Sequence, residues 1–545
     1  MKLILLFAIL TTSLAALKIL IFNPAFGYSQ SRFMGVIADV LSEAGHDFTE
    51  IRPTIDTRLL DKWVSNTQKV LRFPVHPEVD SIMTDFYGPD GFMGLMWTMD
   101  LGPDKAQVLA VNMTEMFTRA CDHLVLETDL FEQLKKEKFD VGLSESFDNC
   151  GHGIFEGIKL KNVITTSSMP VMDHQALLLG IPRVPSYVPG TQAPFSDQMS
   201  IGQRAFNTLM SHYGAQMFLD MAEKQTKAFR RKFGGDFPEI QDLISSSAML
   251  FTNAQPFLDF PRPTIHKVVD LGGIHINETV VDENKDFDKI LSRKPKTVLI
   301  SFGSVAKSYL MPDSYKKSII TAVKSLPDVQ FIWKYEEDDL KSWDLPENLY
   351  LSKWVPQASL LADPRLKLFV THGGLASVTE VAYSGMPAIV VPLFADQPRN
   401  AYMIARQQSA EVFSKFDLDK PEKFAAVIRK ILVDSRYQEK ATFLSELLKN
   451  SPFTPKELLL RNVEFVARFG ALPQLDPYAR HLTFVHVPGS RPSGESRTYR
   501  AQDGAPQLTP CMMRRPFVCF AYDALNKPYP KFPPNEIPEK TQKAC

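Results

Sequence analysis

The amino-acid sequence predicts an α/β protein of at least two domains, the first of them Rossmann-like. A chain of 545 residues is long enough to form at least two domains that each bury a core. Residues 19–49 have the pattern of a strand, a loop, a helix and a second strand. Residues 298–304 open a second domain with an apolar strand followed by a turn of small residues. Both openings are typical of a sheet with helices packed on its faces.

Residues 1–16 are expected to be a secretory signal peptide. Met1 and Lys2 form a positive start, residues 3–10 are apolar, and small residues suited to cleavage follow near Ala15 or Ala16. A buried first strand is the weaker interpretation, because a better strand follows at once over residues 19–22. The mature chain is therefore expected to enter the secretory pathway.

The first domain is expected over residues 17–280. Its first helix is predicted over residues 33–44, and a long helix rich in Met, Phe and Tyr over residues 201–233. Later strands are predicted over residues 139–143 and 248–252.

Residues 91–101, GFMGLMWTMDL, are rich in methionine and aromatic residues. A core helix is the simpler interpretation. Methionine side chains adapt to varied shapes, so the same residues also suit an adaptable wall for apolar ligands. Both interpretations stay open at this stage.

The second domain is expected over residues 281–440. After its opening strand, a helix is predicted over residues 315–325 and a strand over residues 329–333. Further helices are predicted over residues 400–408 and 421–432.

The most informative stretch lies within this second domain. A short buried strand, residues 368–370, ends in Thr371-His372-Gly373-Gly374, and a helix is predicted over residues 375–384 with Gly385 as its left-handed cap. Glycines after a strand let a ligand approach the backbone, and the free N–H groups of the helix point there. Asp396 and Gln397 follow the next strand. Together these groups suit an anion beside a polyol, as in a sugar diphosphate.

Charge and cysteine usage exclude several other classes. The net charge of -1 gives no electrostatic reason to expect a nucleic-acid partner. Cys121 and Cys150 are the only cysteines before the tail, and they could form a disulfide in an oxidising lumen or remain two buried thiols. No CxxC suggests a zinc site, and Asp417-Leu-Asp419 is interpreted as charged loop residues, so no metal site is expected.

The run from Trp354 to Gln397 resembles the signature of the UDP-glycosyltransferases, specifically the animal UDP-glucuronosyltransferase type. The resemblance extends over about residues 17–485, and the dehydrogenase motif GxGxxG is absent. It implies the GT-B architecture, in which two Rossmann-like domains face each other across a cleft. It also implies that residues 441–486 form helices that cross back to the first domain, including a long amphipathic helix over residues 454–469.

The resemblance assigns the nucleotide and diphosphate contacts. Trp354 would stack on uracil with Gln357 nearby, although a tryptophan is otherwise more often a core residue. Ser304 and His372 would face the diphosphate, with His372 donating to a phosphate oxygen without a metal. Many relatives have a phosphate-binding Asn where this chain has Ala376, so the backbone at Gly374 and the side chain of Ser377 must serve instead.

The resemblance also assigns the sugar contacts. Glu380 would accept hydrogen bonds from the ribose hydroxyls, although a solvated surface glutamate is the simpler interpretation of an isolated helix residue. Asp396 and Gln397 would hold the hydroxyls of the transferred sugar.

The expected general base is altered in this chain. Relatives have a catalytic histidine in the first loop, where this chain has Gln30, and an orienting Asp where it has Glu145. An amide cannot accept a proton at neutral pH, and loss of a general base costs a factor of about 10²–10⁴. Glu145 could take the proton directly or through water, the acceptors could need little help, as amines or ionised acids do, or the protein could mainly bind.

The resemblance predicts an inverting, metal-independent transferase that moves a sugar, most simply glucuronate, from UDP to small lipophilic acceptors. The UDP-sugar, UDP-glucuronate or UDP-glucose, is a co-substrate, and no permanently bound cofactor is expected. A glucosyltransferase and a secreted binding protein that has lost turnover are the alternatives. The resemblance leaves room for a homo-oligomer and gives detoxification as a family-level role.

The resemblance places the protein in the lumen of the endoplasmic reticulum. Members of the family are usually anchored there by one membrane-spanning helix near the C-terminus. Residues 487–545 are instead proline-rich and irregular, without an apolar run of about 18 residues, so no such helix is expected in this tail.

Overall fold

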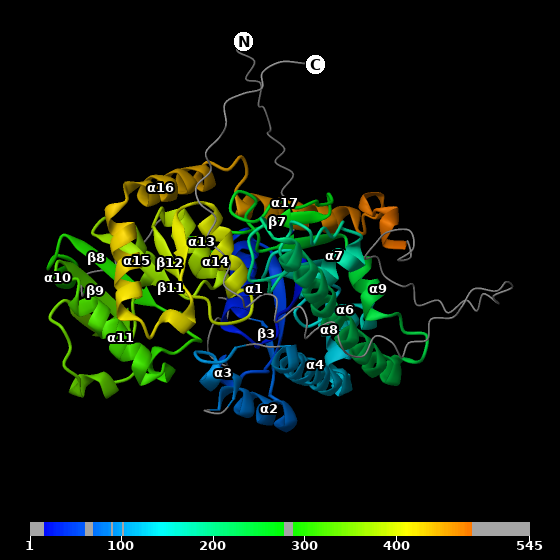
Figure 1. Ribbon diagram of the computed structural model, residues 1–545. Helices are drawn as coiled ribbons and strands as arrows, with labels where there is room; N and C mark the ends of the chain where they lie inside the picture. Colours follow the sequence, from blue (N-terminus) through cyan, green and yellow to red (C-terminus); the bar gives the residue numbers. More distant parts are fainter. Residues whose placement is uncertain (1–15, 60–68, 89–90, 101–102, 277–286, 482–545) are drawn as a thin grey trace, which may run out of the picture.

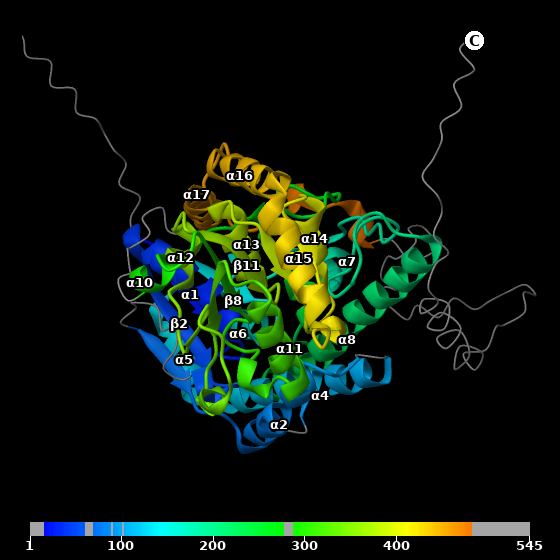
Figure 2. The ribbon, with the colours of Figure 1, turned by 60° about the vertical axis from the view of Figure 1, so that its left-hand side comes forward.

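The computed structural model describes residues 16–59, 69–88, 91–100, 103–276 and 287–481. Two sheets form two lobes that lie side by side (Figures 1 and 2). The strand order is β3-β2-β1-β4-β5-β6-β7 in the first sheet and β10-β9-β8-β11-β12-β13 in the second. Neighbouring strands are parallel in both. The prediction of two Rossmann-like domains is therefore confirmed.

The strands of the first sheet are β1 (Lys18–Phe22), β2 (Asp47–Pro53), β3 (Val70–Phe73), β4 (Val141–Glu145), β5 (Val163–Ser167), β6 (Met249–Thr252) and β7 (Val268–Asp270). The strands of the second sheet are β8 (Lys296–Ser301), β9 (Val329–Lys334), β10 (Leu349–Ser352), β11 (Leu366–Thr371), β12 (Ala388–Val390) and β13 (Ala410–Val412).

The helices of the first domain are α1 (Tyr28–Glu43), α2 (Pro77–Tyr87), α3 (Phe92–Leu95), α4 (Pro103–Leu126), α5 (Thr128–Glu137), α6 (Cys150–Gly157), α7 (Asp173–Leu179), α8 (Ile201–Phe233) and α9 (Ile240–Ser245). The later helices are α10 (Asp288–Leu291), α11 (Asp313–Lys324), α12 (Gln357–Ala362), α13 (Leu375–Ser384), α14 (Gln397–Arg406), α15 (Pro421–Val433), α16 (Ser435–Lys449) and α17 (Pro455–Phe469).

Both faces of the central strands are buried, which explains their continuous apolar runs. In β8, Val298 and Ile300 belong to one core cluster, whereas Leu299, which points to the opposite face, belongs to another. In β1, Ile19 and Ile21 likewise lie on the opposite face from Leu20 and Phe22.

The return to the first domain is made by α17. Thr454 and Glu457 form a capping box at its start, and Leu459, Val463 and Val466 are fully buried in the core that also contains β1. Each such side chain contributes about 1.5–3 kcal/mol through burial. Leu444 and Leu448 of α16 pack in the second domain instead. The expected boundary at residue 441 therefore falls inside α16, and the crossing begins at Pro455 (Figure 1).

Residues 91–100 belong to the first domain but pack against the second. Only Phe92–Leu95 are helical, and Met93, Met96 and Trp97 are buried in the core of the second domain. The indole N–H of Trp97 donates to the Lys307 carbonyl at 3.2 Å. Met93 also lines the inter-domain cavity described below. The segment is thus both a core element and part of a cavity wall, as the two interpretations proposed. The core that it fills, however, belongs to the other domain.

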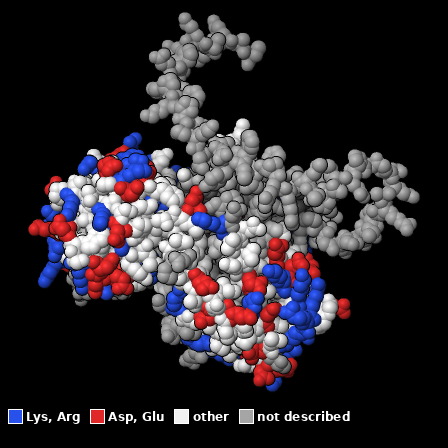
Figure 3. Space-filling view, turned by 60° about the horizontal axis from the view of Figure 1, so that its bottom comes forward, with Lys and Arg blue, Asp and Glu red and all other residues white. Residues whose placement is uncertain are grey.

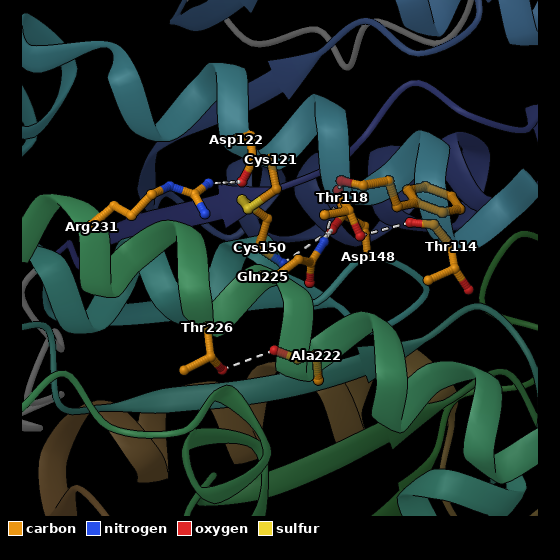
Figure 4. The surroundings of a disulfide bond; sticks show 11 residues. Thr114, Thr118, Cys121, Asp122, Asp148, Cys150, Ala222, Gln225, Thr226 and Arg231 are labelled. Carbon is orange, nitrogen blue, oxygen red and sulfur yellow. Dashed lines mark hydrogen bonds and ion pairs between the residues drawn. A yellow bond between two sulfur atoms is a disulfide. The ribbon is translucent and has the colours of Figure 1, made fainter. Parts of the chain in front are cut away.

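Cys121 and Cys150 form a disulfide that joins α4 to α6 (Figure 4). Their Cα atoms are 5.6 Å apart, and both residues are buried. Beside the disulfide, the Gln225 amide donates to the Asp148 carboxylate at 2.7 Å, and Arg231 pairs with Asp122 at 2.8 Å. The pairing thus decides between the two alternatives that the sequence left open.

The expected signal peptide, residues 1–16, and the expected proline-rich tail, residues 487–545, lie outside the described ranges except for residue 16. Among the helices that the structure describes, none has the length and apolarity needed to cross a bilayer.

Candidate active site

A cavity of about 2530 Å³ lies between the two domains and is lined by residues of both. The loops after β1, β8, β11 and β12, all at the carboxyl ends of parallel strands, contribute to its walls. All of the expected site residues line it except Glu145. Acidic and basic side chains are interspersed on both lobes in Figure 3, so no single sign of charge dominates that face.

His372 lies directly after β11, and its ring lies between Gly303 and Gly374 in space. A Cβ atom at Gly303 would lie 2.6 Å from His372 Cε1, and one at Gly374 would lie 2.6 Å from Nε2. The two glycines therefore make room for the imidazole as well as for a ligand. Burial, and then the nearby Lys334 cation, lower the pKa of His372 to about 4, so the ring is neutral near pH 7.

The Nδ1 atom of His372 is buried and has no partner within the described part of the protein. A neutral imidazole carries one N–H donor, so the ring can serve a ligand oxygen in the cavity. Lys334, the last residue of β9, supplies a cation to the same region. Its Nζ donates to the Gly303 carbonyl at 2.8 Å and pairs with Glu336 at 3.0 Å. Lys334 was not among the expected site residues, because in the sequence it is only the last residue of an apolar strand.

Gln357, Ser377 and Glu380 form one hydrogen-bonded group. The Gln357 amide donates to Glu380 Oε2 at 2.5 Å and to Ser377 Oγ at 3.2 Å. The Glu380 side chain is only 10% exposed, so it is not the solvated surface glutamate considered above. Its other oxygen pairs with Arg32 of α1, from the opposite domain, at 3.3 Å. No sequence pattern indicated this contact, because 348 residues separate the two partners.

Trp354 and Ser304 present their side chains openly. Trp354 lies in the loop before α12, lines the cavity and is 68% exposed, so it is not a core tryptophan. Ser304 is exposed in the turn after β8 and lines the same cavity. An exposed indole offers a flat face on which a base can stack.

Asp396 and Gln397 follow a strained turn. Ala395 has a φ of 55°, a left-handed conformation that costs a non-glycine residue about 1–2 kcal/mol. Burial raises the pKa of Asp396, whose carboxylate accepts from the Asn400 amide at 2.6 Å. Asn400 also donates to the Gly373 carbonyl at 3.0 Å, which ties this loop to the segment around His372.

The side-chain oxygen of Gln397 is occupied. It accepts from the backbone N–H groups of Leu393 at 2.9 Å and Phe394 at 3.2 Å. The two residues therefore divide the hydrogen-bonding roles between them. Asp396 supplies the acceptor, and Gln397 can offer a ligand its NH₂ group.

Glu145 and Gln30 occupy different depths. Gln30 lines the cavity, and its side-chain oxygen accepts from the Ser29 hydroxyl at 3.0 Å. Glu145 ends β4, is 1% exposed and lies behind Ser168. The Ser168 backbone N–H donates to it at 3.0 Å and the Ser168 hydroxyl at 3.2 Å. Ser168, which the sequence analysis did not single out, lines the cavity in its place.

Aromatic side chains cover the first-domain wall. Phe26 stacks on Phe147 with ring centroids 5.5 Å apart, and Phe147 meets Phe218 edge to face at 5.5 Å. His174 stacks on Phe218 at 4.3 Å, and burial lowers its pKa to about 3, so it behaves as a neutral ring. These four residues, named here the aromatic cluster, all line the cavity. They make one wall of the cavity apolar, which suits flat or apolar ligands.

The described residues contain no group of three His, Cys, Asp or Glu arranged to hold a metal ion. Asp417, from the segment Asp417-Leu-Asp419, pairs with Lys420 and with Lys423 at 3.1 Å. It therefore behaves as a charged loop residue.

Comparisons with known proteins agree with this geometry. The model of the family UDPGT, UDP-glucuronosyl and UDP-glucosyl transferase, matches residues 18–487. The chain is 31% identical over 485 residues to ugt-48 of Caenorhabditis elegans, whose name places it among the UDP-glucuronosyltransferases; the match covers 86% of this chain and 89% of the relative. Mouse UDP-glucuronosyltransferase 3A1 is 29% identical over 370 residues, covering 67% of this chain and 69% of the relative.

A solved structure with the same fold is that of Phytolacca americana UGT2 complexed with UDP-2fluoro-glucose and pterostilbene. Its TM-score is 0.55 at 16% identity, and the match covers 83% of this chain and all of that one. This likeness confirms the GT-B fold. With the family match over residues 18–487, it follows that the chain belongs to the UDP-glycosyltransferase family and is a hexosyltransferase.

Proposed function

We propose that the enzyme transfers glucuronate from UDP to small lipophilic acceptors with inversion at the anomeric carbon. One observation carries the proposal: a single cavity has a polar second-domain wall containing His372 and Lys334, and an opposite wall formed by the aromatic cluster. An acceptor on the aromatic cluster would attack the sugar from the face opposite UDP. The bond to the acceptor oxygen forms while the bond to the diphosphate oxygen breaks, so an α-linked donor gives a β-linked product.

His372 is the proposed donor to the leaving diphosphate. Because its pKa is lowered to about 4, the ring offers a neutral N–H that needs no prior protonation. Negative charge grows on the diphosphate oxygen as the glycosidic bond breaks, and Lys334 supplies positive charge nearby. One well-placed donor at such an oxygen is worth about 3–4 kcal/mol of barrier.

Other donor contacts are proposed from the same wall. Ser304 and the backbone at Gly374 would face the diphosphate, and Trp354 would stack on uracil. Glu380, oriented by Gln357, would accept from the ribose hydroxyls.

Glu145 is the proposed acceptor of the proton, acting through Ser168. An acceptor hydroxyl in the cavity would donate to Ser168 Oγ, while Ser168 passes its own proton to the Glu145 carboxylate 3.2 Å away. Burial raises the pKa of Glu145 to about 7, which suits a base near neutral pH. The alternative is that the acceptors, such as amines, need little help from a general base, which would explain why Gln30 is tolerated.

Glucuronate is proposed as the sugar because the nematode and mouse relatives are named for its transfer. Glucose is the second candidate, since the family description includes both sugars. A binding protein with lost turnover is the candidate from another class, favoured by Gln30 alone.

The endoplasmic reticulum lumen is proposed as the compartment. The buried Cys121–Cys150 disulfide supports an oxidising environment, as does the expected signal peptide.

The test is incubation of the purified protein with UDP-glucuronate or UDP-glucose and a panel of phenols and amines. We expect UDP release together with a β-glucuronide of a phenol, and slower or no transfer from UDP-glucose. Faster glucosyl transfer would overturn the sugar assignment. UDP release without any conjugate would indicate hydrolysis, and binding of the donor without UDP release would favour a binding protein.

A further inference from the structure

The Glu380 carboxylate is held by groups from both domains. Gln357 of α12 donates to Oε2 at 2.5 Å, and Arg32 of α1 donates to Oε1 at 3.3 Å. His275, in the segment leading out of the first domain, lies 4.0 Å from Oε1. All four residues line the cavity, and the side chains of Arg32, Glu380 and His275 are 25%, 10% and 5% exposed.

The positive charge in this group belongs to Arg32. Burial first, and then the proximity of the Arg32 guanidinium, lower the pKa of His275 to about 3. His275 is therefore neutral under physiological conditions and cannot form an ion pair. A guanidinium, in contrast, stays charged at every pH at which the protein is folded.

One protein partner on each oxygen has a specific consequence for a diol ligand. A carboxylate oxygen has about two acceptor positions, so each Glu380 oxygen can accept from its protein partner and from one ligand hydroxyl. With Gln357 fixing one oxygen and Arg32 the other, the carboxylate cannot rotate freely before the ligand arrives. Such preorganisation strengthens binding because less ordering is left to the ligand.

We propose that Arg32 is a positioning residue of the donor site, which reaches across from the acceptor domain to orient Glu380 for the two ribose hydroxyls. The inference rests on the proposed contact between Glu380 and ribose. It extends the donor site onto the first domain and ties nucleotide affinity to the arrangement of the two domains.

A simpler role would be that Arg32 only clamps the domains together. The chain offers a matched control, because Arg406 of α14 forms a second cross-domain ion pair with Asp197 at 2.8 Å. Neither residue of that pair lines the cavity. Arg406→Met therefore removes an inter-domain ion pair and leaves the donor site untouched.

The experiment compares binding of UDP with binding of 2′,3′-dideoxy-UDP, which lacks both ribose hydroxyls, by calorimetry. The full-length protein is used as wild type, Arg32→Met, Arg32→Lys and Arg406→Met. We expect Arg32→Met to weaken UDP about tenfold while the affinity for the dideoxy analogue stays unchanged. Arg32→Lys should retain part of the preference, and Arg406→Met all of it.

A double substitution makes the assignment sharper. If Arg32 acts through Glu380, Arg32→Met should add nothing further in a Glu380→Gln background. Equal weakening of UDP and of the dideoxy analogue would show a general clamp and overturn the inference, as would an Arg32→Met protein that binds UDP like the wild type. If Arg32→Met does not fold, Arg32→Lys takes its place. The inference is then overturned if Arg32→Lys prefers UDP over the dideoxy analogue as strongly as the wild type does, or if its effect on UDP affinity adds to that of Glu380→Gln. Failure of the wild type to bind UDP would instead overturn the proposed function and this inference with it.

Discussion

Ser168 lies between Glu145 and the inter-domain cavity, and donates to the buried carboxylate from its backbone N–H at 3.0 Å and from its hydroxyl at 3.2 Å. The residue that faces an acceptor is therefore the serine, while the group able to hold a proton lies behind it. The resemblance puts Gln30 at the position of the family's base, so the proposed chemistry depends most on the pair of Ser168 and Glu145.

Glu145→Gln should lower kcat for phenol acceptors by about 10²-fold, because an amide cannot receive the proton. Ser168→Ala should have a similar effect if the hydroxyl relays it. The measurement is the pH profile of kcat/KM with a weakly acidic phenol, where the wild-type rate should rise as the pH passes through about 7 and the variant should lack that limb. Unchanged turnover in Glu145→Gln would remove Glu145 from the mechanism. Amine acceptors serve as the internal comparison, since they should lose less.

The same substitution has a separate effect on stability. Burial raises the folded-state pKa of Glu145 from 4.5 to about 7, so folding favours the protonated carboxyl. The stability that this group provides is present below about pH 4.5 and is lost as the pH rises through 7. Glu145→Gln should therefore raise the free energy of unfolding at pH 8 by on the order of 1–3 kcal/mol and change it little at low pH. Denaturant titrations at both pH values check this, and equal shifts at the two would contradict it.

Gly303→Ala should inactivate the enzyme about as fully as His372→Ala, with a loss in kcat of about 10²–10³-fold. A Cβ at Gly303 would lie 2.6 Å from the His372 ring, and the φ of +83° is unfavourable for alanine. The matched control is Gly202→Ala, because Gly202 lies near the start of α8 with open space around it. Steady-state kinetics of the three variants test the point. Activity of Gly303→Ala close to that of the wild type would show that the position of the ring is not critical.

Replacing both Cys121 and Cys150 by serine should lower the free energy of unfolding by about 3–4 kcal/mol, the chain-entropy value for a closed loop spanning a sequence separation of 29 residues. The disulfide lies away from the cavity, so the folded variant should keep its KM for the UDP-sugar. Chemical denaturation with and without a reductant provides the measurement. If the reductant does not change the free energy of unfolding of the wild-type protein, the two cysteines are not bonded and the prediction is wrong.

Local sequence signals predicted much of the fold. The long helix over residues 201–233 and the helix over residues 375–384 have the predicted bounds, because a capping box begins the first and Gly385, with a φ of 69°, ends the second. The predicted strand over residues 248–252 begins only one residue early. In each case the signal lies within a few residues of the feature that it predicts.

Features that depend on distant segments could not be predicted in this way. Residues 91–100 read as a core segment, but nothing local shows that Trp97 packs against Phe302 of the other domain. The contact between Arg32 and Glu380 likewise depends on how two domains meet. Gln397 was expected at the sugar site from the resemblance. That its side-chain oxygen accepts from two backbone N–H groups depends on the path of the turn at Ala395, which the sequence does not show.

The most direct test of the account is a crystal structure of the protein soaked with UDP-glucuronate and a phenol that cannot react. The account predicts that the diphosphate lies beside His372, the ribose beside Glu380, and the sugar beside Asp396, with the phenol against the aromatic cluster. A nucleotide bound outside this cavity, or with its diphosphate far from His372, would contradict the account.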